Sequence, residues 1–147
     1  LPCVHAMVAA ALAAALALGA DWINSGRGFM FALGCVQSLH CHTNACPTGV
    51  ATQDIGRQRA LVISDKAERV YNYHHNTLHA LAEVLAAAGV NHPSELSPNR
   101  LMVRTSANEA RPATEVYDLL KKGVLEAAPE STHLHADWLR ARAESFR

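Results

Sequence analysis

Three cysteines in one short stretch are the residues of this 147-residue chain best suited to chemistry. Cys35, Cys41 and Cys46 are separated by five and then four residues, and Pro47 follows the last of them directly. Cysteine thiolates are the usual protein ligands of iron–sulfur clusters, and three of them suit a three-iron, four-sulfide cluster, in which each iron takes one protein ligand. The spacing therefore favours a shared inorganic centre held by one compact loop.

Zinc is the main alternative for the same stretch. His40 and His42 flank Cys41, and either could complete a Cys3His tetrahedron with the three thiolates. A third interpretation is that the thiols are simply buried, because free cysteine is among the most buried residue types. Under the zinc interpretation the chain is a small helical module whose metal supports its structure or binds a partner.

A segment with two glycines precedes the cysteines. Ser25-Gly26-Arg27-Gly28 leads into an apolar run over residues 29–33, which we interpret as the first turns of a short helix. Backbone N–H groups at a helix start attract phosphate, and the Arg27 guanidinium would add positive charge. The segment is therefore a candidate phosphate site, while an ordinary turn without a ligand is the other interpretation.

Histidines form a second, weaker candidate for metal binding. His75 and His79 are four residues apart on a predicted helix, with His74 beside them, so the pair could bind a metal on one helix face. No carboxylate or cysteine completes such a site in the local sequence, and we expect a solvated helix face. No nucleophile, base and orienting group occur together, so we predict no catalytic residue.

The elements that must position these residues follow an α/β order. Alanine-rich residues 4–18 predict a helix that is buried on more than one side and ends at Gly19. Residues 20–24 are rich in strand formers, and a helix, a strand and a glycine loop make half of an α/β repeat. Residues 51–63 are polar and predict a surface segment.

A long amphipathic helix is the clearest element of the chain. It is expected to begin at a cap on Ser64 or Asp65 and to end before Gly89. Beyond residue 101, two weaker helices, at about residues 107–120 and 132–146, predict a peripheral tail. The apolar face of the long helix holds Val70, Tyr73, Thr77, Leu78, Leu81, Val84, Leu85 and Ala88.

Composition excludes several classes of protein. The 13 basic and 13 acidic side chains balance, so no global field attracts nucleic acid or an anionic membrane. The first apolar run is mostly alanine and lacks a positively charged leader, so we expect neither a membrane-spanning helix nor a secretory signal. Four cysteines, three of them clustered, fit the cytoplasm better than a disulfide scaffold. Because the chain starts at Leu1 inside an apparent element, we expect a fragment.

Three motifs resemble the flavin-binding domain of glutamate synthases. They are Leu-Gly-Ala-Asp at 18–21, Gly-Phe-Met-Phe-Ala-Leu-Gly-Cys at 28–35, and Cys-His-Thr-Asn-Ala-Cys-Pro-Thr-Gly-Val-Ala-Thr-Gln-Asp at 41–54. The chain is most similar to the short bacterial members, the FMN-binding glutamate synthase family proteins, over roughly residues 8–104. The three-cysteine motif followed by Pro-Thr-Gly-Val-Ala-Thr-Gln carries most of this resemblance.

The resemblance implies an α/β fold, the C-terminal fragment of a (β/α)8 TIM barrel. Residues 4–18 would be the seventh barrel helix, residues 20–24 the eighth strand and residues 66–88 the eighth helix. Residues 1–92 would then belong to the FMN and iron–sulfur barrel domain, and residues 93–147 would form a mostly helical C-terminal extension.

The resemblance also implies cofactors, ligands and a reaction. FMN would bind through its phosphate at Ser25, Gly26, Arg27 and Gly28, since barrel phosphate sites follow the last strands. Cys35, Cys41 and Cys46 match the ligands of a 3Fe-4S cluster one for one. In the family, electrons from a donor, either ferredoxin or an NAD(P)H-dependent partner, pass through the cluster to FMN. Reduced FMN then converts 2-oxoglutarate and ammonia, which can come from glutamine, into L-glutamate.

Parts of the family pattern differ or are missing in this sequence. Leu-Pro-Cys-Val-His stands where members carry part of a glycine-rich loop, many members have threonine or alanine at the position of Arg27, and barrel strands one to six lie outside the sequence. One strand cannot close a barrel, and buried ladder groups without partners cost about 1–3 kcal/mol each. We therefore expect the chain alone to be a helical remnant around a loose strand, with little or no catalysis.

Overall fold

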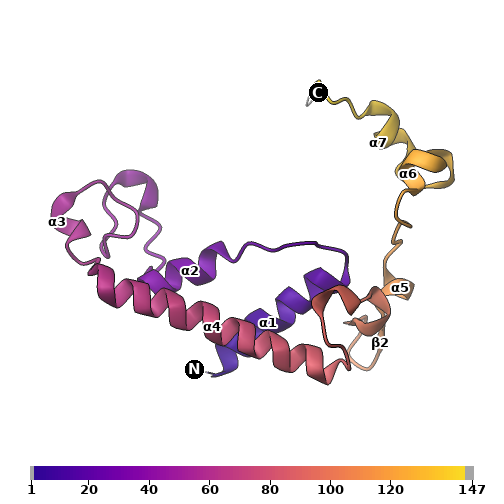
Figure 1. The fold of residues 1–147 in the computed structure, drawn as a ribbon. Coiled ribbons are helices and arrows are strands. Elements are labelled where there is room, and N and C mark those ends of the chain that lie inside the picture. Colours follow the sequence, from indigo (N-terminus) through magenta and orange to yellow (C-terminus); the bar gives the residue numbers. More distant parts are fainter. Residues whose placement is uncertain (1, 145–147) are drawn as a thin grey trace. The chain divides into compact units, whose positions relative to one another are not determined.

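The computed structural model describes residues 2–144. The chain divides into two units, Leu1–Leu101 and Met102–Arg147. The first unit contains all the candidate site residues named above. Its longer helices are α1 (Pro2–Ala17), α2 (Gly26–Leu33) and α4 (Ile63–Ala87) (Figure 1). The 3-10 turn η1 (Cys41–Thr43) and the single turn α3 (Ile55–Gln58) lie between α2 and α4, and the 3-10 turns η2 (Pro93–Glu95) and η3 (Pro98–Arg100) follow α4.

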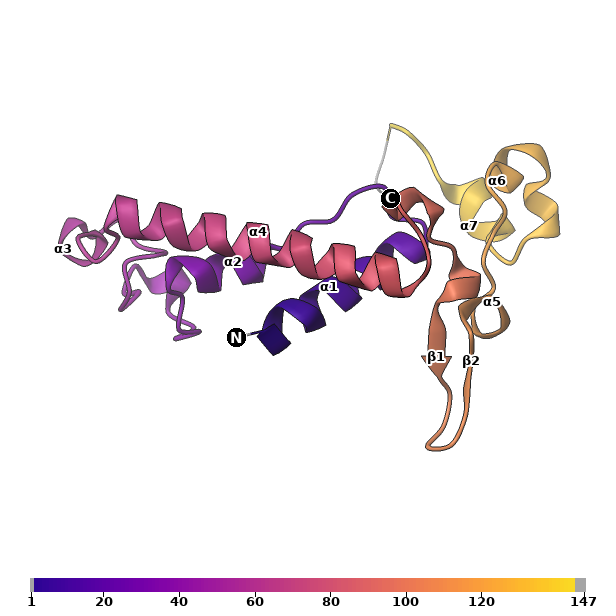
Figure 2. The same cartoon turned by 60° about the horizontal axis from the view of Figure 1, so that its bottom comes forward.

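Helices α1 and α4 pack against each other and form the core of the first unit (Figure 2). Small alanine side chains on α1, such as the fully buried Ala9, let the two helices approach closely. The predicted helix at residues 4–18 is confirmed, but only one broad side of it is buried, because Ala6, Met7 and Ala10 are exposed. The core residues are Ala9, Ala13, Ala80, Leu81, Leu85 and Val90.

The segment between α1 and α2 is an irregular connection (Figure 1). Residues 20–24 were predicted to form a strand, yet no strand is present in this part of the described chain. A strand exists only where a neighbour completes its ladder of hydrogen bonds, and none of the described residues pairs with this segment. Trp22 in its middle is 76% exposed. Residues 20–24 therefore have the propensity to form a strand, but no described strand lies beside them to pair with.

Helix α4 confirms the predicted long amphipathic helix over almost its whole range. Its first residue is Ile63, and the preceding Val62 gives it no side-chain cap, so the predicted caps at Ser64 or Asp65 are wrong. Its buried side chains include Thr77, Leu81 and Leu85, as predicted. Leu78, predicted on the same face, is 50% exposed.

The end of α4 is tied to the segment that follows it. Arg100 donates a hydrogen bond from Nη1 to the backbone carbonyl of Ala88 at 2.6 Å. The last carbonyls of a helix have no partner within the helix, and a cation there also interacts favourably with the helix dipole. Arg100 therefore ties the turn η3 to the C-terminal end of α4.

Replacing Arg100 with alanine is expected to lower the free energy of unfolding of the first unit by about 1 kcal/mol, because one exposed hydrogen bond from a charged donor is lost. The midpoint of urea unfolding followed by circular dichroism measures the change. Arg59→Ala is the control, since the Arg59 side chain makes no hydrogen bond within the described residues. Equal midpoints for the two variants would contradict this role of Arg100.

The second unit begins with a β-hairpin and continues with short helical turns (Figure 2). Strands β1 (Met102–Arg104) and β2 (Ala110–Pro112) are antiparallel, with Val103 opposite Arg111. The helix predicted at about residues 107–120 is therefore wrong in its first part, because the Thr105 N–H donates to the Glu109 carbonyl and closes a hairpin there, and only the short α5 is helical within that range. The helices that follow are α5 (Ala113–Val116), α6 (Val124–Ala127), the 3-10 turn η4 (Pro129–Ser131) and α7 (His135–Arg140).

The second predicted tail helix, at residues 132–146, is confirmed only as the short helix α7. Its predicted end at Phe146 lies outside the described residues. Within the described part of the chain, no helix is both long enough and apolar enough to cross a membrane.

Candidate functional site

The cysteine segment follows α2 and turns sharply several times. Gly34 ends α2 with a left-handed φ of 108°, and Cys35 follows it. Gln37, Leu39 and Asn44 also have positive φ values, of 54°, 60° and 61°, which is uncommon for residues other than glycine. Such backbone conformations persist where the surrounding structure requires them and cluster at ligand sites.

Cys46 is held in surroundings that favour its thiolate. It is 5% exposed, and its Sγ lies 3.5 Å from the Thr48 Oγ1. Hydrogen bonds from the Thr48 hydroxyl and from the backbone N–H groups of Ala51 and Thr48 lower the pKa of Cys46 from 9.0 to about 7. Burial opposes this change of pKa, and the backbone of Val50 adds a smaller lowering. These hydrogen bonds therefore favour the thiolate form of Cys46.

Cys35 and Cys41 share one pocket beside α2. The Cys35 Sγ is half-buried and accepts a hydrogen bond from the Gln37 N–H at 3.5 Å, whereas Cys41 is exposed. The pocket has a volume of about 300 Å³ and brings both thiols to the side of α2 that carries Arg27. Its lining residues are Arg27, Met30, Phe31, Cys35, Gln37, Leu39 and Cys41.

The three predicted ligands are thiols, which suit a metal centre, but the structure does not bring all three together. Cys46 does not line the pocket that Cys35 and Cys41 share. Among the described residues, no three His, Cys, Asp or Glu side chains lie together as a metal ligand set. His40 and His42, the ligands considered for zinc, are exposed. Cys35 and Cys41 thus lie in one pocket, whereas Cys46 lies outside it and is surrounded by hydrogen-bond donors that stabilise a thiolate.

Asn44 fastens the cysteine segment to the residues before α3. Its side-chain Oδ1 accepts hydrogen bonds from the Thr52 hydroxyl at 2.9 Å and from the Gln53 N–H at 2.6 Å. Its backbone carbonyl accepts a second contact from the Thr52 hydroxyl at 2.7 Å. The sequence analysis did not identify Asn44, although asparagine is enriched both in left-handed conformations and in turns.

Replacing Asn44 with alanine is expected to loosen this connection by about 1–3 kcal/mol, because both side-chain hydrogen bonds are lost and the left-handed conformation becomes strained. The amide of Gln53 should then exchange with solvent faster, which NMR-detected hydrogen exchange measures residue by residue. Asn24→Ala is the control, because Asn24 is exposed and unpaired within the described residues. Unchanged exchange at Gln53 would show that Asn44 does not hold the segment.

The glycine segment is part of a helix rather than a loop before one. Helix α2 begins at Gly26, so the expectation that the helix starts after Gly28 is wrong. Ser25 is the residue before the first turn, and its hydroxyl makes no capping hydrogen bond. Gly26 has open space where a Cβ would lie, and Arg27 is exposed. These two residues are therefore open to solvent at the start of α2.

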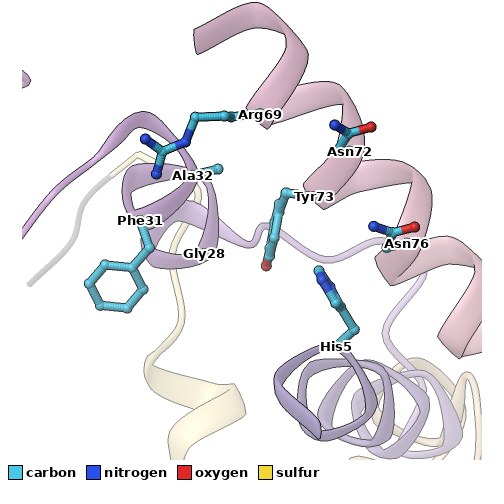
Figure 3. A pocket seen from close by; sticks show the side chains of 8 residues that line it. All are labelled: His5, Gly28, Phe31, Ala32, Arg69, Asn72, Tyr73 and Asn76. Atoms are coloured by element: carbon cyan, nitrogen blue, oxygen red, sulfur yellow. The ribbon is translucent and has the colours of Figure 1, made fainter. Parts of the chain in front are cut away.

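Ser25 and Gly28 face α4 instead. The Ser25 Oγ lies 2.9 Å from the Tyr73 Oη, and a Cβ on Gly28 would lie 2.5 Å from the Tyr73 Cζ. Figure 3 shows Tyr73 extending from α4 toward Gly28, beside His5 of α1. The predicted four-residue phosphate site thus consists of two open residues and two that pack on Tyr73. The sequence analysis placed Tyr73 on an apolar face, although a buried tyrosine hydroxyl usually needs a partner.

The helix histidines are solvated, as expected. His74, His75 and His79 are all exposed, and the rings of Tyr71 and His75 stack with centroids 5.7 Å apart. The structure does supply one carboxylate that the sequence analysis overlooked. Glu83 Oε1 lies 3.7 Å from the His79 Nδ1, four residues along the helix.

Comparison with known protein families shows to which family these helices and the cysteine segment belong. Residues 5–91 match the family model described as the conserved region in glutamate synthase. The chain belongs to the glutamate synthase family. The matched residues include α1, α2, the cysteine segment and α4, and the match ends before the second unit begins. The resemblance found in the sequence is therefore confirmed at the level of the family.

Individual relatives agree with this assignment. The glutamate synthase large subunit-like protein YerD of Bacillus subtilis is 47% identical over 93 residues, which cover 63% of this chain and 18% of YerD. The archaeal NADPH glutamate synthase of Methanocaldococcus jannaschii is 39% identical over 90 residues, covering 61% of this chain and 18% of the relative. The large chain of the NADPH glutamate synthase of Azospirillum brasilense is 32% identical over 79 residues, covering 54% and 5%. The chain thus spans about a fifth of the first two relatives, and no solved structure matches it.

Proposed function

We propose that this chain is the C-terminal part of the barrel of a glutamate synthase-type oxidoreductase. In this proposal α1 is the seventh barrel helix, residues 20–24 are the eighth strand and α4 is the eighth helix. The close packing of α1 on α4 supports it, because consecutive helices of a (β/α)8 barrel are neighbours. The unpaired residues 20–24 support it as well, since further strands beside them would give them a ladder.

We further propose that Cys35, Cys41 and Cys46 bind a 3Fe-4S cluster and that the start of α2 binds the FMN phosphate. One observation carries this proposal, namely that Arg27, Cys35 and Cys41 line the same pocket. The glycine segment and the cysteine segment therefore meet, as a flavin and a cluster that exchange electrons must. When bound, the two groups would supply electrons and a hydride for forming L-glutamate from 2-oxoglutarate and ammonia, with ferredoxin or an NAD(P)H-dependent protein as donor.

The residues of this chain would bind and orient these groups. The hydrogen-bond donors around Cys46 hold its thiolate, and the Gln37 N–H supports Cys35. Gly26 exposes backbone at the start of α2, and Arg27 adds a guanidinium for the phosphate. We assign no residue of the chain to the chemical step, and we propose that the 147 residues alone do not catalyse it. Reduced thiolate ligands place the protein in the cytoplasm in this proposal.

Reconstitution of the purified chain with iron and sulfide under anaerobic conditions tests the proposal. We expect a brown protein with broad visible absorbance and about three irons per chain, as a 3Fe-4S cluster requires. A colourless protein that takes up one zinc per chain would refute the cluster and support the structural zinc module. Retention of FMN by the chain through gel filtration would contradict the proposal that most of the flavin site lies in other strands.

A further inference from the structure

Tyr73 holds the first turn of α2 by three contacts. Its hydroxyl is hydrogen-bonded to the Ser25 hydroxyl at 2.9 Å. Its ring end occupies the space that a Cβ on Gly28 would need. Its ring also meets that of Phe29 edge to face, with centroids 5.0 Å apart and planes at 78°. One side chain of α4 therefore fixes where α2 begins.

The hydrogen bond to Tyr73 determines what the Ser25 hydroxyl does. A serine before the first turn of a helix normally accepts a hydrogen bond from the second or third backbone N–H of that helix. In α2 those groups belong to Arg27 and Gly28, and Ser25 caps neither of them. The hydroxyl that would cap the helix is instead engaged by Tyr73.

Tyr73 is itself held in place from α1. The His5 ring lies 5.8 Å from the Tyr73 ring, and its Nδ1 lies 3.4 Å from the Thr77 hydroxyl. Thr77 is one helical turn beyond Tyr73 on α4 and is buried. Figure 3 shows His5 and Tyr73 converging beside Gly28. The position of the tyrosine therefore depends on the packing of α1 on α4.

We propose that Tyr73 is a positioning residue that withholds the Ser25 cap and so leaves the first-turn N–H groups of α2 available to a phosphate. This inference rests on the proposed phosphate site at Gly26 and Arg27. An uncapped helix start attracts an anion, whereas a serine cap would satisfy one of the same donors. The Tyr73 hydroxyl thus keeps the anion site open by holding the Ser25 hydroxyl, without contacting the anion.

Four variants of the chain test this role: Tyr73→Phe, Ser25→Ala, the double variant, and the control Tyr71→Phe, which removes a hydroxyl from the exposed tyrosine of the same helix. Amide hydrogen exchange at Arg27 and Gly28 reports capping, and NMR titration with inorganic phosphate reports binding. Tyr73→Phe should slow exchange of one of these amides and weaken phosphate binding, each about fivefold, the usual effect of a serine cap. The double variant should recover the wild-type values, and Ser25→Ala and Tyr71→Phe should leave them unchanged.

Recovery in the double variant separates this role from a merely structural one, because a loss of packing at Tyr73 would persist when Ser25 is also removed. Loss without recovery would therefore overturn the inference, and so would unchanged exchange in Tyr73→Phe. Faster exchange in Ser25→Ala alone would also overturn the inference, because Ser25 would then already cap the helix in the wild-type chain. This measurement leaves Tyr73 unchanged and so does not depend on the packing of its ring. The expected exchange pattern without phosphate binding to any variant would instead refute the phosphate site and leave the control of the cap standing.

Discussion

Replacing Gly49 with alanine should detach the end of the cysteine segment from α3. Gly49 is buried and has a φ of 78°, which strains any residue with a Cβ. An added Cβ would collide with the backbone carbonyl of Arg57, and it would also lie 3.0 Å from the Arg57 carbonyl carbon and 3.2 Å from the Gln58 Cα. These atoms belong to the backbone of α3 and cannot turn aside as a side chain could.

The effect should reach Cys46, because Gly49 lies between the Thr48 and Ala51 groups that stabilise its thiolate. Overpacking and backbone strain together should cost about 2–4 kcal/mol. We expect this cost to open the segment locally. Alkylation is measured above pH 9.0, where the Cys46 thiol is ionised with or without these hydrogen bonds. We expect its rate, followed by peptide mass spectrometry, to rise at least tenfold, since local opening of about 1.4 kcal/mol already gives that factor.

Gly56→Ala is the matched control for this prediction. An added Cβ on Gly56 would meet only the Asp54 Oδ1, at 3.1 Å, a side-chain atom that caps the Arg57 N–H and needs to give by only a few tenths of an ångström. Alanine is also favoured over glycine within a helix by roughly 0.5–1 kcal/mol. Gly56→Ala should therefore alkylate at the wild-type rate or more slowly. Similar rates for the Gly49 and Gly56 variants would show that the backbone contact with Arg57 does not hold the segment.

Replacing Cys41 with serine should abolish cluster assembly in the reconstituted chain. Each iron of a 3Fe-4S cluster takes one protein ligand, so a missing thiolate leaves one iron without its anchor. Iron content and visible absorbance should fall to background. Cys3→Ser should retain the wild-type iron content, because Cys3 lies outside the three-cysteine motif.

Substitution of both His40 and His42 by alanine separates the cluster from zinc. The double variant should keep its iron, because the cluster uses thiolates alone, whereas a Cys3His zinc site would lose its fourth ligand. Undiminished iron in Cys41→Ser would refute the assignment of Cys41 as a ligand. Loss of metal in the histidine variant would favour zinc.

Features set by local pattern were predicted well. The repeat of apolar residues along α4 and the alanines of α1 identify both helices, since helix periodicity and propensity act over short distances. The family was also identifiable, because the residues of the cysteine motif stand close together in the sequence. The types of residue at the candidate site were therefore available before the structure.

Features set by distant partners were not predicted. Residues 20–24 have the propensity of a strand, but a strand depends on neighbours that local sequence does not specify. The hairpin that replaces a predicted tail helix depends on a hydrogen bond between Thr105 and Glu109. The division of the glycine segment into open and packed residues depends on Tyr73, which lies 48 positions beyond Ser25. Long-range contacts therefore determine how the predicted residues are used.

The exposure of Trp22 makes the proposed eighth strand visible to spectroscopy. Its indole is 76% exposed in a segment that lacks strand partners. Fluorescence from an indole in water lies at longer wavelengths than fluorescence from a buried one, so Trp22 is an internal optical reporter of this segment. With Trp138 replaced by phenylalanine, its emission follows directly whether added polypeptide covers residues 20–24, with no label on the cysteines.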